Sequence, residues 1–253
     1  MARLEAQGIT KRFGGVVAVD DVSLTAADGR ITALIGPNGA GKTTLFNVIN
    51  GFDRADSGSV VLDGQAIARP KPWRMCRVGV VRTFQLAQGF PSLSVWDNMM
   101  VAGADDRSES MHVALLGSTA WRRGLADAES RAVEILERLD LWDRRDSFVE
   151  DLSAGEVRLV EFARQLMASP RLLMLDEPAS GVDPSHISRI AGLIRELNQD
   201  GITVLVIDHN LAFIMDIADY VYVLSDGRLL CEGPPAEVAR DPRVIETYIG
   251  GAG

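Results

Sequence analysis

The segment that most constrains the fold is a glycine-rich run over residues 36–44, which directly follows the apolar stretch 31–35. Its letters, Gly-Pro-Asn-Gly-Ala-Gly-Lys-Thr-Thr, match G-x-x-x-x-G-K-[ST] at every fixed position. A strand before this loop and a helix after it, predicted over residues 45–49, direct backbone N–H groups and a positive helix end at one anion. The sequence therefore predicts an α/β fold with a phosphate-binding loop. The alternative is a plain glycine-rich turn, which this context disfavours.

The residue types within this loop suit a nucleotide. Lys42 supplies a mobile cation, and the Thr43 hydroxyl can ligate Mg²⁺. We therefore expect the nucleotide phosphates to be held by Gly36, Pro37, Asn38, Gly39, Ala40, Gly41, Lys42, Thr43 and Thr44.

Two adjacent acids, Asp176 and Glu177, follow the apolar run 172–175. Continuous apolar runs are typical of strands covered on both faces of a parallel sheet, and such sheets bind ligands at the carboxyl ends of their strands. We expect Asp176 to hold Mg²⁺, usually through water, and Glu177 to polarise the attacking water as a general base. The alternative is a solvated acidic turn closed by Pro178, which the presence of the phosphate loop disfavours.

Asp208 and His209 follow the next apolar run, residues 202–207, in the same way. A histidine at that strand end could hydrogen-bond the γ-phosphate of a nucleotide. An isolated histidine is more often a core or surface residue, but its place beside the acids favours the phosphate contact.

Residues 152–156, Leu-Ser-Ala-Gly-Glu, precede a segment with apolar residues at helical spacing. Ser153 and Glu156 form the S-x-x-E pattern of a capping box, in which each side chain accepts a hydrogen bond from a free backbone N–H. A capped helix start beside Gly155 is also a good anion site, so the structural and the binding interpretations do not compete.

The remaining segments outline the architecture. Residues 4–13, 17–24 and 59–62 are predicted strands separated by glycine turns, which indicates an antiparallel layer. Residues from about 95 to 170 are predicted to form an inserted helical subdomain, since Ala132, Ile135, Leu136 and Leu139 recur at helical spacing. Residues 105–124 are expected to be a loop or short helices.

Composition narrows the class of protein. A chain of 253 residues, 47% of them hydrophobic, suits one large α/β domain or two small ones. The net charge of −9 disfavours nucleic-acid partners. Two isolated cysteines are too few for a disulfide framework or a four-ligand zinc site and are consistent with a reducing cytosol. No apolar run approaches the ~18 residues that span a bilayer, so any membrane connection is expected to come through a partner.

In combination these motifs resemble the ATP-binding cassette (ABC) family over almost the whole chain. The family's order of phosphate loop, glutamine loop, signature, acidic strand end, D-loop and switch histidine is matched by residues 36–44, Gln85, 152–156, Asp176-Glu177, 180–183 and His209. The resemblance implies one ABC ATPase domain. Its core, with a mixed sheet and an antiparallel β subdomain, would comprise residues 1–94 and 171–253, and the helical subdomain about 95–170.

The resemblance also implies roles for residues whose pattern alone is not informative. Gln85 would contact Mg²⁺ or water and sense the membrane subunits, although by itself it is a polar loop residue. Phe13 would stack on adenine; its alternative is a strand aromatic packed in the core. ATP would lie between the phosphate loop of one cassette and Ser153 and Gly155 of a second. The signature departs from the usual Leu-Ser-Gly-Gly-Gln at Ala154 and Glu156, and the capping box makes glutamate tolerable there.

A narrower resemblance is to the larger ATPase subunit of branched-chain amino acid importers, through residues 11–15, 82–85, 120–123 and 241–245. It implies two membrane permeases, a second, non-identical cassette, a solute-binding protein outside the membrane, and a peripheral place on its cytoplasmic face. Cassettes that energise uptake of urea, short amides or other small solutes look much the same. A soluble cassette ATPase, such as one of iron–sulfur assembly, and a P-loop kinase are the remaining alternatives.

Overall fold

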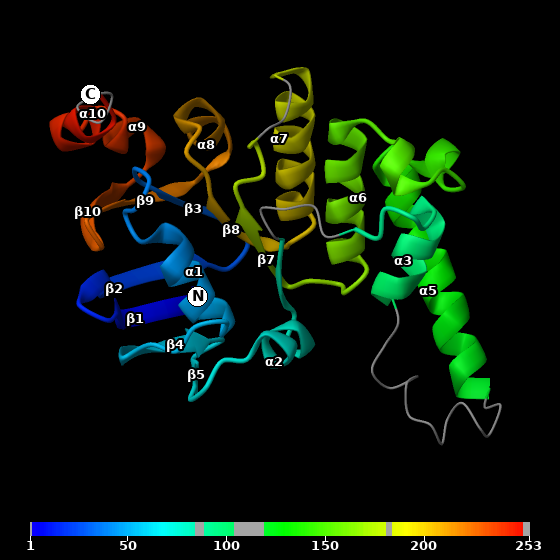
Figure 1. Ribbon diagram of the computed structural model, residues 1–253, viewed down its shortest axis with the longest axis horizontal. Coiled ribbons are helices and arrows are strands. Elements are labelled where there is room, and N and C mark those ends of the chain that lie inside the picture. The colour runs from blue at the N-terminus through cyan, green and yellow to red at the C-terminus, as the bar shows by residue number, and fades with distance from the viewer. Residues whose placement is uncertain (1, 84–88, 104–118, 181–183, 250–253) are drawn as a thin grey trace. The chain divides into compact units, whose positions relative to one another are not determined.

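The computed structural model describes residues 2–83, 89–103, 119–180 and 184–249 (Figure 1). The chain divides into two compact units, one formed by Met1–Gln85 together with Arg171–Gly253 and the other by Leu86–Pro170. The first unit is therefore built from two distant parts of the chain, and the second is inserted between them.

A four-stranded antiparallel sheet forms one layer of the first unit, in the order β2-β1-β4-β5. Its strands are β1 (Ala2–Phe13), β2 (Val16–Ala27), β4 (Ser57–Leu62) and β5 (Gln65–Ile67). The turn between β4 and β5 consists of Asp63 (φ 49°) and Gly64 (φ 77°), a pair whose positive φ angles suit a tight hairpin. The predicted antiparallel layer is confirmed.

A six-stranded sheet forms the centre of the same unit, in the order β10-β9-β3-β8-β7-β6. The strands β3 (Ile31–Ile35), β6 (Val80–Arg82), β7 (Leu172–Asp176), β8 (Thr203–Ile207) and β9 (Tyr220–Ser225) pair in parallel, and β10 (Arg228–Gly233) joins β9 antiparallel. All residues of β3, β7 and β8 are buried, which confirms the expectation that apolar runs mark strands covered on both faces. The helices of this unit are α1 (Lys42–Asn50), α2 (Pro72–Arg77), α7 (Pro184–Gln199), α8 (Leu211–Ile217), α9 (Pro235–Val238) and α10 (Pro242–Ile249).

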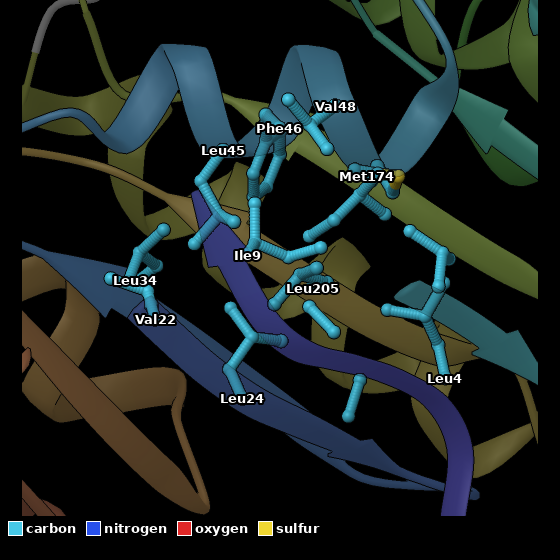
Figure 2. Close-up of a cluster of buried hydrophobic side chains, with 14 of the residues drawn as sticks. Leu4, Ile9, Val22, Leu24, Leu34, Leu45, Phe46, Val48, Met174 and Leu205 are labelled. Atoms are coloured by element: carbon cyan, nitrogen blue, oxygen red, sulfur yellow. The ribbon is translucent and has the colours of Figure 1, made fainter. Parts of the chain in front are cut away.

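The core of the first unit lies where α1 and the antiparallel sheet meet one face of the central sheet (Figure 2). Leu45 and Phe46 of α1 are fully buried in this cluster, as is Ile9 of β1. Met174 of β7 and Leu205 of β8 reach it from the central sheet. Each such side chain contributes about 1.5–3 kcal/mol on burial, so the cluster fixes α1, and with it the loop that precedes α1, against the strands.

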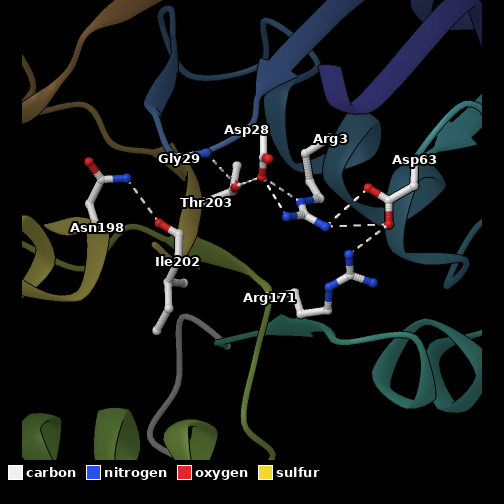
Figure 3. Close-up of polar contacts among 8 residues, drawn as sticks. All are labelled: Arg3, Asp28, Gly29, Asp63, Arg171, Asn198, Ile202 and Thr203. Atoms are coloured by element: carbon white, nitrogen blue, oxygen red, sulfur yellow. Dashed lines mark hydrogen bonds and ion pairs between the residues drawn. The ribbon is translucent and has the colours of Figure 1, made fainter. Parts of the chain in front are cut away.

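A polar network ties the two sheets together at the end where β7 and β8 begin (Figure 3). Arg3 of β1 donates through Nε to Oδ1 of Asp28 at 2.9 Å and through Nη1 to Oδ1 of Asp63 at 3.1 Å. Arg171, just before β7, pairs with Oδ2 of Asp63 at 3.2 Å, and Thr203 at the start of β8 donates to Asp28. The hydrogen bond from Arg3 lowers the pKa of Asp28. This network lies at the starts of β7 and β8 and does not involve their carboxyl ends.

The second unit is helical. It contains α3 (Val95–Gly103), α5 (Thr119–Arg138) and α6 (Ala154–Leu166), with short 3₁₀ turns η1 (Trp142–Arg144) and η2 (Val149–Asp151). The helix predicted from Ala132, Ile135 and Leu136 is confirmed as part of α5. The expectation of a loop or short helices over residues 105–124 is wrong for residues 119–124, which form the first turns of this 20-residue helix. Residues 104–118 lie outside the described part of the chain.

Candidate nucleotide-binding site

The loop between β3 and α1 follows a path that only glycine permits at two positions. Gly36 has φ 152° and Gly41 has φ 95°. A Cβ atom on Gly36 would lie 2.3 Å from the carbonyl oxygen of Leu224, and one on Gly41 would lie 2.2 Å from that of Ala18. Any side chain at these positions would therefore collide with the backbone. The shape of the loop thus requires glycine at both positions.

Helix α1 begins directly after this loop. Gly41, at its N-cap, has a left-handed conformation, and among the described residues no side chain caps the helix start. The N–H groups of the first turn therefore have no intrahelical acceptor, which makes them donors for an anion. The structure thus brings the predicted phosphate-binding residues into one loop and one helix start, with Thr43 exposed there.

Lys42 folds back across the loop. Its Nζ donates to the carbonyl oxygens of Gly36 at 2.7 Å and Pro37 at 2.9 Å. Burial lowers the pKa of Lys42, while attraction by the three carboxylates at the neighbouring strand ends, Glu177, Asp176 and Asp208, acts in the opposite direction. The ammonium group therefore lies within the electrostatic reach of the acids that the sequence had placed on other strands.

The strand ends of β7 and β8 lie side by side. Asp176 is in register with Ile207, and the N–H of Glu177 donates to the Ile207 carbonyl at 2.8 Å. As a result His209 Nδ1 lies 3.7 Å from Oε2 of Glu177. The His209 side chain is 54% exposed and that of Glu177 is 16% exposed, so water can reach both groups. The structure thus brings together the predicted base and the predicted phosphate-sensing histidine.

Asp176, the expected metal ligand, is buried and holds a partner that the sequence analysis did not anticipate. Arg82, the last residue of β6, donates through Nη2 to Oδ2 of Asp176 at 2.7 Å, and both side chains are about 5% exposed or less. The N–H of Asp176 donates to the Thr83 hydroxyl at 3.2 Å. Residues on the neighbouring strand therefore fix both the backbone and the carboxylate of Asp176.

Arg82 also reaches the helix that follows the phosphate loop. Its Nη1 donates to Oδ1 of Asn47 in α1 at 2.7 Å, and its guanidinium lies 5.7 Å from the ring centre of Phe46 and 5.6 Å from that of Phe52. One side chain thus connects the acidic strand end to α1. The sequence contained a signal for this contact, because Arg82 is a single charged residue at the end of a buried β-strand. An unpaired charge is costly there, so a partner is expected.

Phe13 lies at the end of β1, and its side chain is 49% exposed. The alternative of a strand aromatic packed in the core is therefore wrong. Phe13 lies on the surface of the first unit, where Nζ of Lys11 is 5.0 Å from the centre of its ring.

In the second unit, the predicted capping box at the start of α6 is confirmed. The Ser153 hydroxyl accepts from the N–H of Glu156, and Oε2 of Glu156 accepts from the N–H of Ser153 at 2.9 Å. Hydrogen bonds from Ser153 lower the pKa of Glu156, and Arg144 adds to this through a 3.0 Å ion pair. Glu156 is therefore occupied in holding the helix start, with Gly155 buried beside it.

Comparison with known proteins identifies the family. A family model described as "ABC transporter" matches residues 19–180, more than half of the chain. The chain belongs to the ABC transporter family. A second model, described as "Branched-chain amino acid ATP-binding cassette transporter", matches residues 228–253 of the cassette.

Curated relatives match the cassette over nearly its whole length. The high-affinity branched-chain amino acid transport ATP-binding protein LivG of Salmonella typhimurium is 38% identical over 98% of both chains, and the LivG of Escherichia coli is 37% identical over the same shares. The corresponding protein BraF of Pseudomonas aeruginosa is 37% identical over 98% of both chains. The cassette is therefore an ATPase subunit of a transport system.

Solved structures confirm the predicted α/β ABC ATPase fold. A nucleotide-free ATP-binding cassette from an ABC transporter has a TM-score of 0.86 at 36% identity, covering 99% of this chain and 100% of the other. The ADP conformation of an ATP-binding cassette also has a TM-score of 0.86, at 36% identity over 99% of both chains. Nucleotide binding is thus a property of the family to which this cassette belongs.

The donors present fit a magnesium ion that arrives with the phosphates. Thr43 and Asp176 offer hard oxygen atoms, which Mg²⁺ prefers, while among the described residues no group of three or more His, Cys, Asp or Glu side chains could hold a metal. These residues would supply a partial ligand set, which substrate phosphates would complete. Gln85 and residues 181–183, including Asp183, lie outside the described part of the cassette.

Proposed function

We propose that this ABC cassette hydrolyses ATP to power the import of branched-chain amino acids through partner membrane permeases. The names of relatives that match 98% of the chain support this cargo, as does the branched-chain family model at residues 228–253. The observation that supports the ATPase role is that the phosphate loop and the strand-end acids lie close together in one unit. The strand-end carboxylates attract Lys42 of the loop, and one of them, Glu177, lies beside His209.

In the proposed site, the phosphates lie along residues 36–44 with Lys42 contacting them, and Phe13 stacks on the adenine. Asp176, Thr43 and Gln85 hold Mg²⁺, which when bound neutralises part of the phosphate charge. Water reaches Glu177, whose carboxylate accepts its proton.

His209 contacts the γ-phosphate in this proposal. Its Nδ1 faces Glu177 at 3.7 Å, which leaves Nε2 on the far side of the ring for the phosphate. The histidine would then report whether the terminal phosphate is still present.

The site is completed by a second cassette. Asn38 and Gly39 of the loop are exposed, as is Thr43, so one side of the bound phosphates would be open to solvent. A capped helix start whose remaining N–H groups can donate is a natural cover for an anion. We assign this cover to Ser153 and Gly155 of the neighbouring, non-identical cassette. Binding of ATP then closes the pair and hydrolysis reopens it.

The cassette works as one ABC ATPase domain, with a nucleotide-binding core of residues 1–94 and 171–253 and a helical subdomain of about 95–170. Within the described residues, no helix is both long enough and apolar enough to cross a bilayer. The names of the relatives as transport proteins support an assembly with two permease subunits and a solute-binding protein, in which the cassette is held peripherally at the cytoplasmic face.

The test is transport by the assembled system. The cassette is purified with the membrane proteins that accompany it, reconstituted in liposomes, and supplied with ATP and labelled leucine, urea or acetamide in parallel. We expect leucine uptake alone to depend on ATP. Glu177→Gln should retain ATP binding and lose both turnover and uptake, whereas Glu134→Gln on the exposed face of α5 should retain them.

Two outcomes contradict the proposal. Uptake of urea or acetamide in place of leucine would transfer the function to another small solute. Co-purification with soluble scaffold proteins and no permease would indicate a soluble cassette ATPase.

A further inference from the structure

We propose that Asp208 is a positioning residue that holds the backbone on which Glu177 and His209 are mounted. The inference rests on the proposed role of Glu177 as the base. Asp208 directly precedes His209 at the end of β8, and its side chain is fully buried. Both of its carboxylate oxygens accept from backbone N–H groups, so its action is exerted through its neighbours.

The first observation is the backbone of Glu177. Its φ angle is +49°, a left-handed conformation that glutamate rarely adopts. Such a conformation persists only where the surroundings impose it, and such residues gather at active sites. Something must therefore hold the chain on both sides of Glu177.

On the near side, the strand pairing does so, because the N–H of Glu177 donates to the Ile207 carbonyl at 2.8 Å. On the far side, the N–H of Ala179 donates to Oδ2 of Asp208 at 3.0 Å. Together, the two bonds hold the chain before and after Glu177. The turn is closed by a bond from the Ser180 N–H to the Glu177 carbonyl at 3.1 Å.

The same carboxylate holds the histidine segment. Oδ1 of Asp208 accepts from the N–H of Asn210 at 2.9 Å. His209 therefore lies between the two residues that this hydrogen bond joins. His209 Nδ1 lies 3.8 Å from this oxygen and 3.7 Å from Oε2 of Glu177. One side chain thus joins the segment after Glu177 to the segment around His209 and sets the distance between them.

A carboxylate is needed to connect the two segments because both of its oxygens accept a hydrogen bond from a backbone N–H group. Asparagine offers one accepting oxygen and an NH₂ group, so Asp208→Asn would place a donor against one of the two backbone N–H groups. The segment facing that donor must move away. We expect Lys42 to keep its bonds to the Gly36 and Pro37 carbonyls in this variant, because neither bond involves Asp208.

A merely structural role predicts lower stability with normal turnover in each folded molecule, whereas a positioning role predicts a lower kcat. Misplacement of a reacting group by about 1 Å costs roughly a hundredfold in rate. We therefore expect Asp208→Asn to lower the kcat for ATP by about 30- to 100-fold in the assembled transporter, with the KM for ATP changed less than about threefold.

Asp219→Asn is the matched control. Asp219 also accepts a backbone N–H, that of Ile31 at 2.9 Å, but at the opposite end of the sheet. It should retain a kcat within about threefold of the wild type. Asp208→Ser is the second variant, used in case the asparagine variant fails to assemble. Its hydroxyl can accept a hydrogen bond from one of the two backbone N–H groups, and a drop in kcat of about tenfold is expected.

The outcomes separate this inference from the proposed function. If Glu177→Gln abolishes turnover while either Asp208 variant keeps a kcat within threefold of the wild type, the positioning role is refuted and the proposed base stands. If Glu177→Gln turns over ATP normally, the proposed function of the site fails first. A raised KM with unchanged kcat in the Asp208 variants would also refute positioning, because it would mean loss of binding alone.

Discussion

Replacing Arg82 by methionine tests the energetics of the buried ion pair beside the phosphate loop. The substitution leaves the Asp176 carboxylate buried without its guanidinium, since both side chains are about 5% exposed or less. Removing one partner of a buried, hydrogen-bonded pair costs about 3–5 kcal/mol. The lost bond to Asn47 acts in the same direction, while the methionine retains part of the packing against Phe46. We expect a loss of about 4 kcal/mol in the free energy of unfolding, or roughly 8–16 °C in Tm.

Urea unfolding of the isolated cassette, followed by circular dichroism, measures this loss, and a double-mutant cycle with Asp176→Asn assigns it to the pair. The double variant should lose about as much as either single variant, which corresponds to a coupling of roughly 4 kcal/mol. Arg228→Met is the matched control. Its guanidinium lies 2.6 Å from Asp20 but is 73% exposed, so the expected cost is about 1 kcal/mol or less. Additive single effects, or equal costs at the two sites, would refute the reasoning.

The remaining predictions concern the nucleotide and the helical unit. Lys42→Ala should weaken ATP binding by about tenfold or more in calorimetry, because it removes a cation of the phosphate loop; unchanged affinity would contradict the proposed site. Glu156→Gln should leave ATP turnover within a few-fold, since both side chains serve in a capping box with Ser153. The lowered pKa of Glu156 also has a consequence for stability. The carboxylate stabilises the helix start above its unfolded pKa of about 4.3, and this is lost as the pH falls through the lower folded pKa. The protection factors of the amides at the start of α6, which are corrected for the pH dependence of intrinsic exchange, should therefore fall between about pH 5 and 3 in the wild type and stay constant in Glu156→Gln.

The features that the sequence predicted well are those in which the pattern and the geometry coincide. The apolar run 172–175 predicts a buried strand whatever its neighbours are, and the next two residues must then lie at its end. Likewise, Gly36 and Gly41 are required by a loop whose shape leaves no room for a Cβ atom. The capping box was equally accessible because its two side chains are three residues apart.

The features that the sequence did not predict depend on strand register. Arg82 and Asp176 are 94 residues apart, and only the pairing of β6 with β7 brings them together. Asp208 and Ala179 meet for the same reason across β7 and β8. The start of α5 was missed because residues 119–124 contain a glycine and few apolar positions, so the helical period is weak there.

The two adjacent acids differ in surroundings, and strand geometry is the reason. Successive side chains of a strand point to opposite sides, so Asp176, the last residue of β7, is directed to one side and meets Arg82. A sixth strand residue in regular conformation would direct the next carboxylate to the opposite, buried face. The left-handed backbone at Glu177 ends the strand instead and leaves its side chain 16% exposed beside His209. A carboxylate fixed by a buried guanidinium is suited to orient the water of a metal ion, and one that water can reach is suited to exchange a proton. The division of labour between neighbouring residues therefore depends on the strained turn, and a variant that relaxed the turn would impair proton transfer before it impaired metal binding.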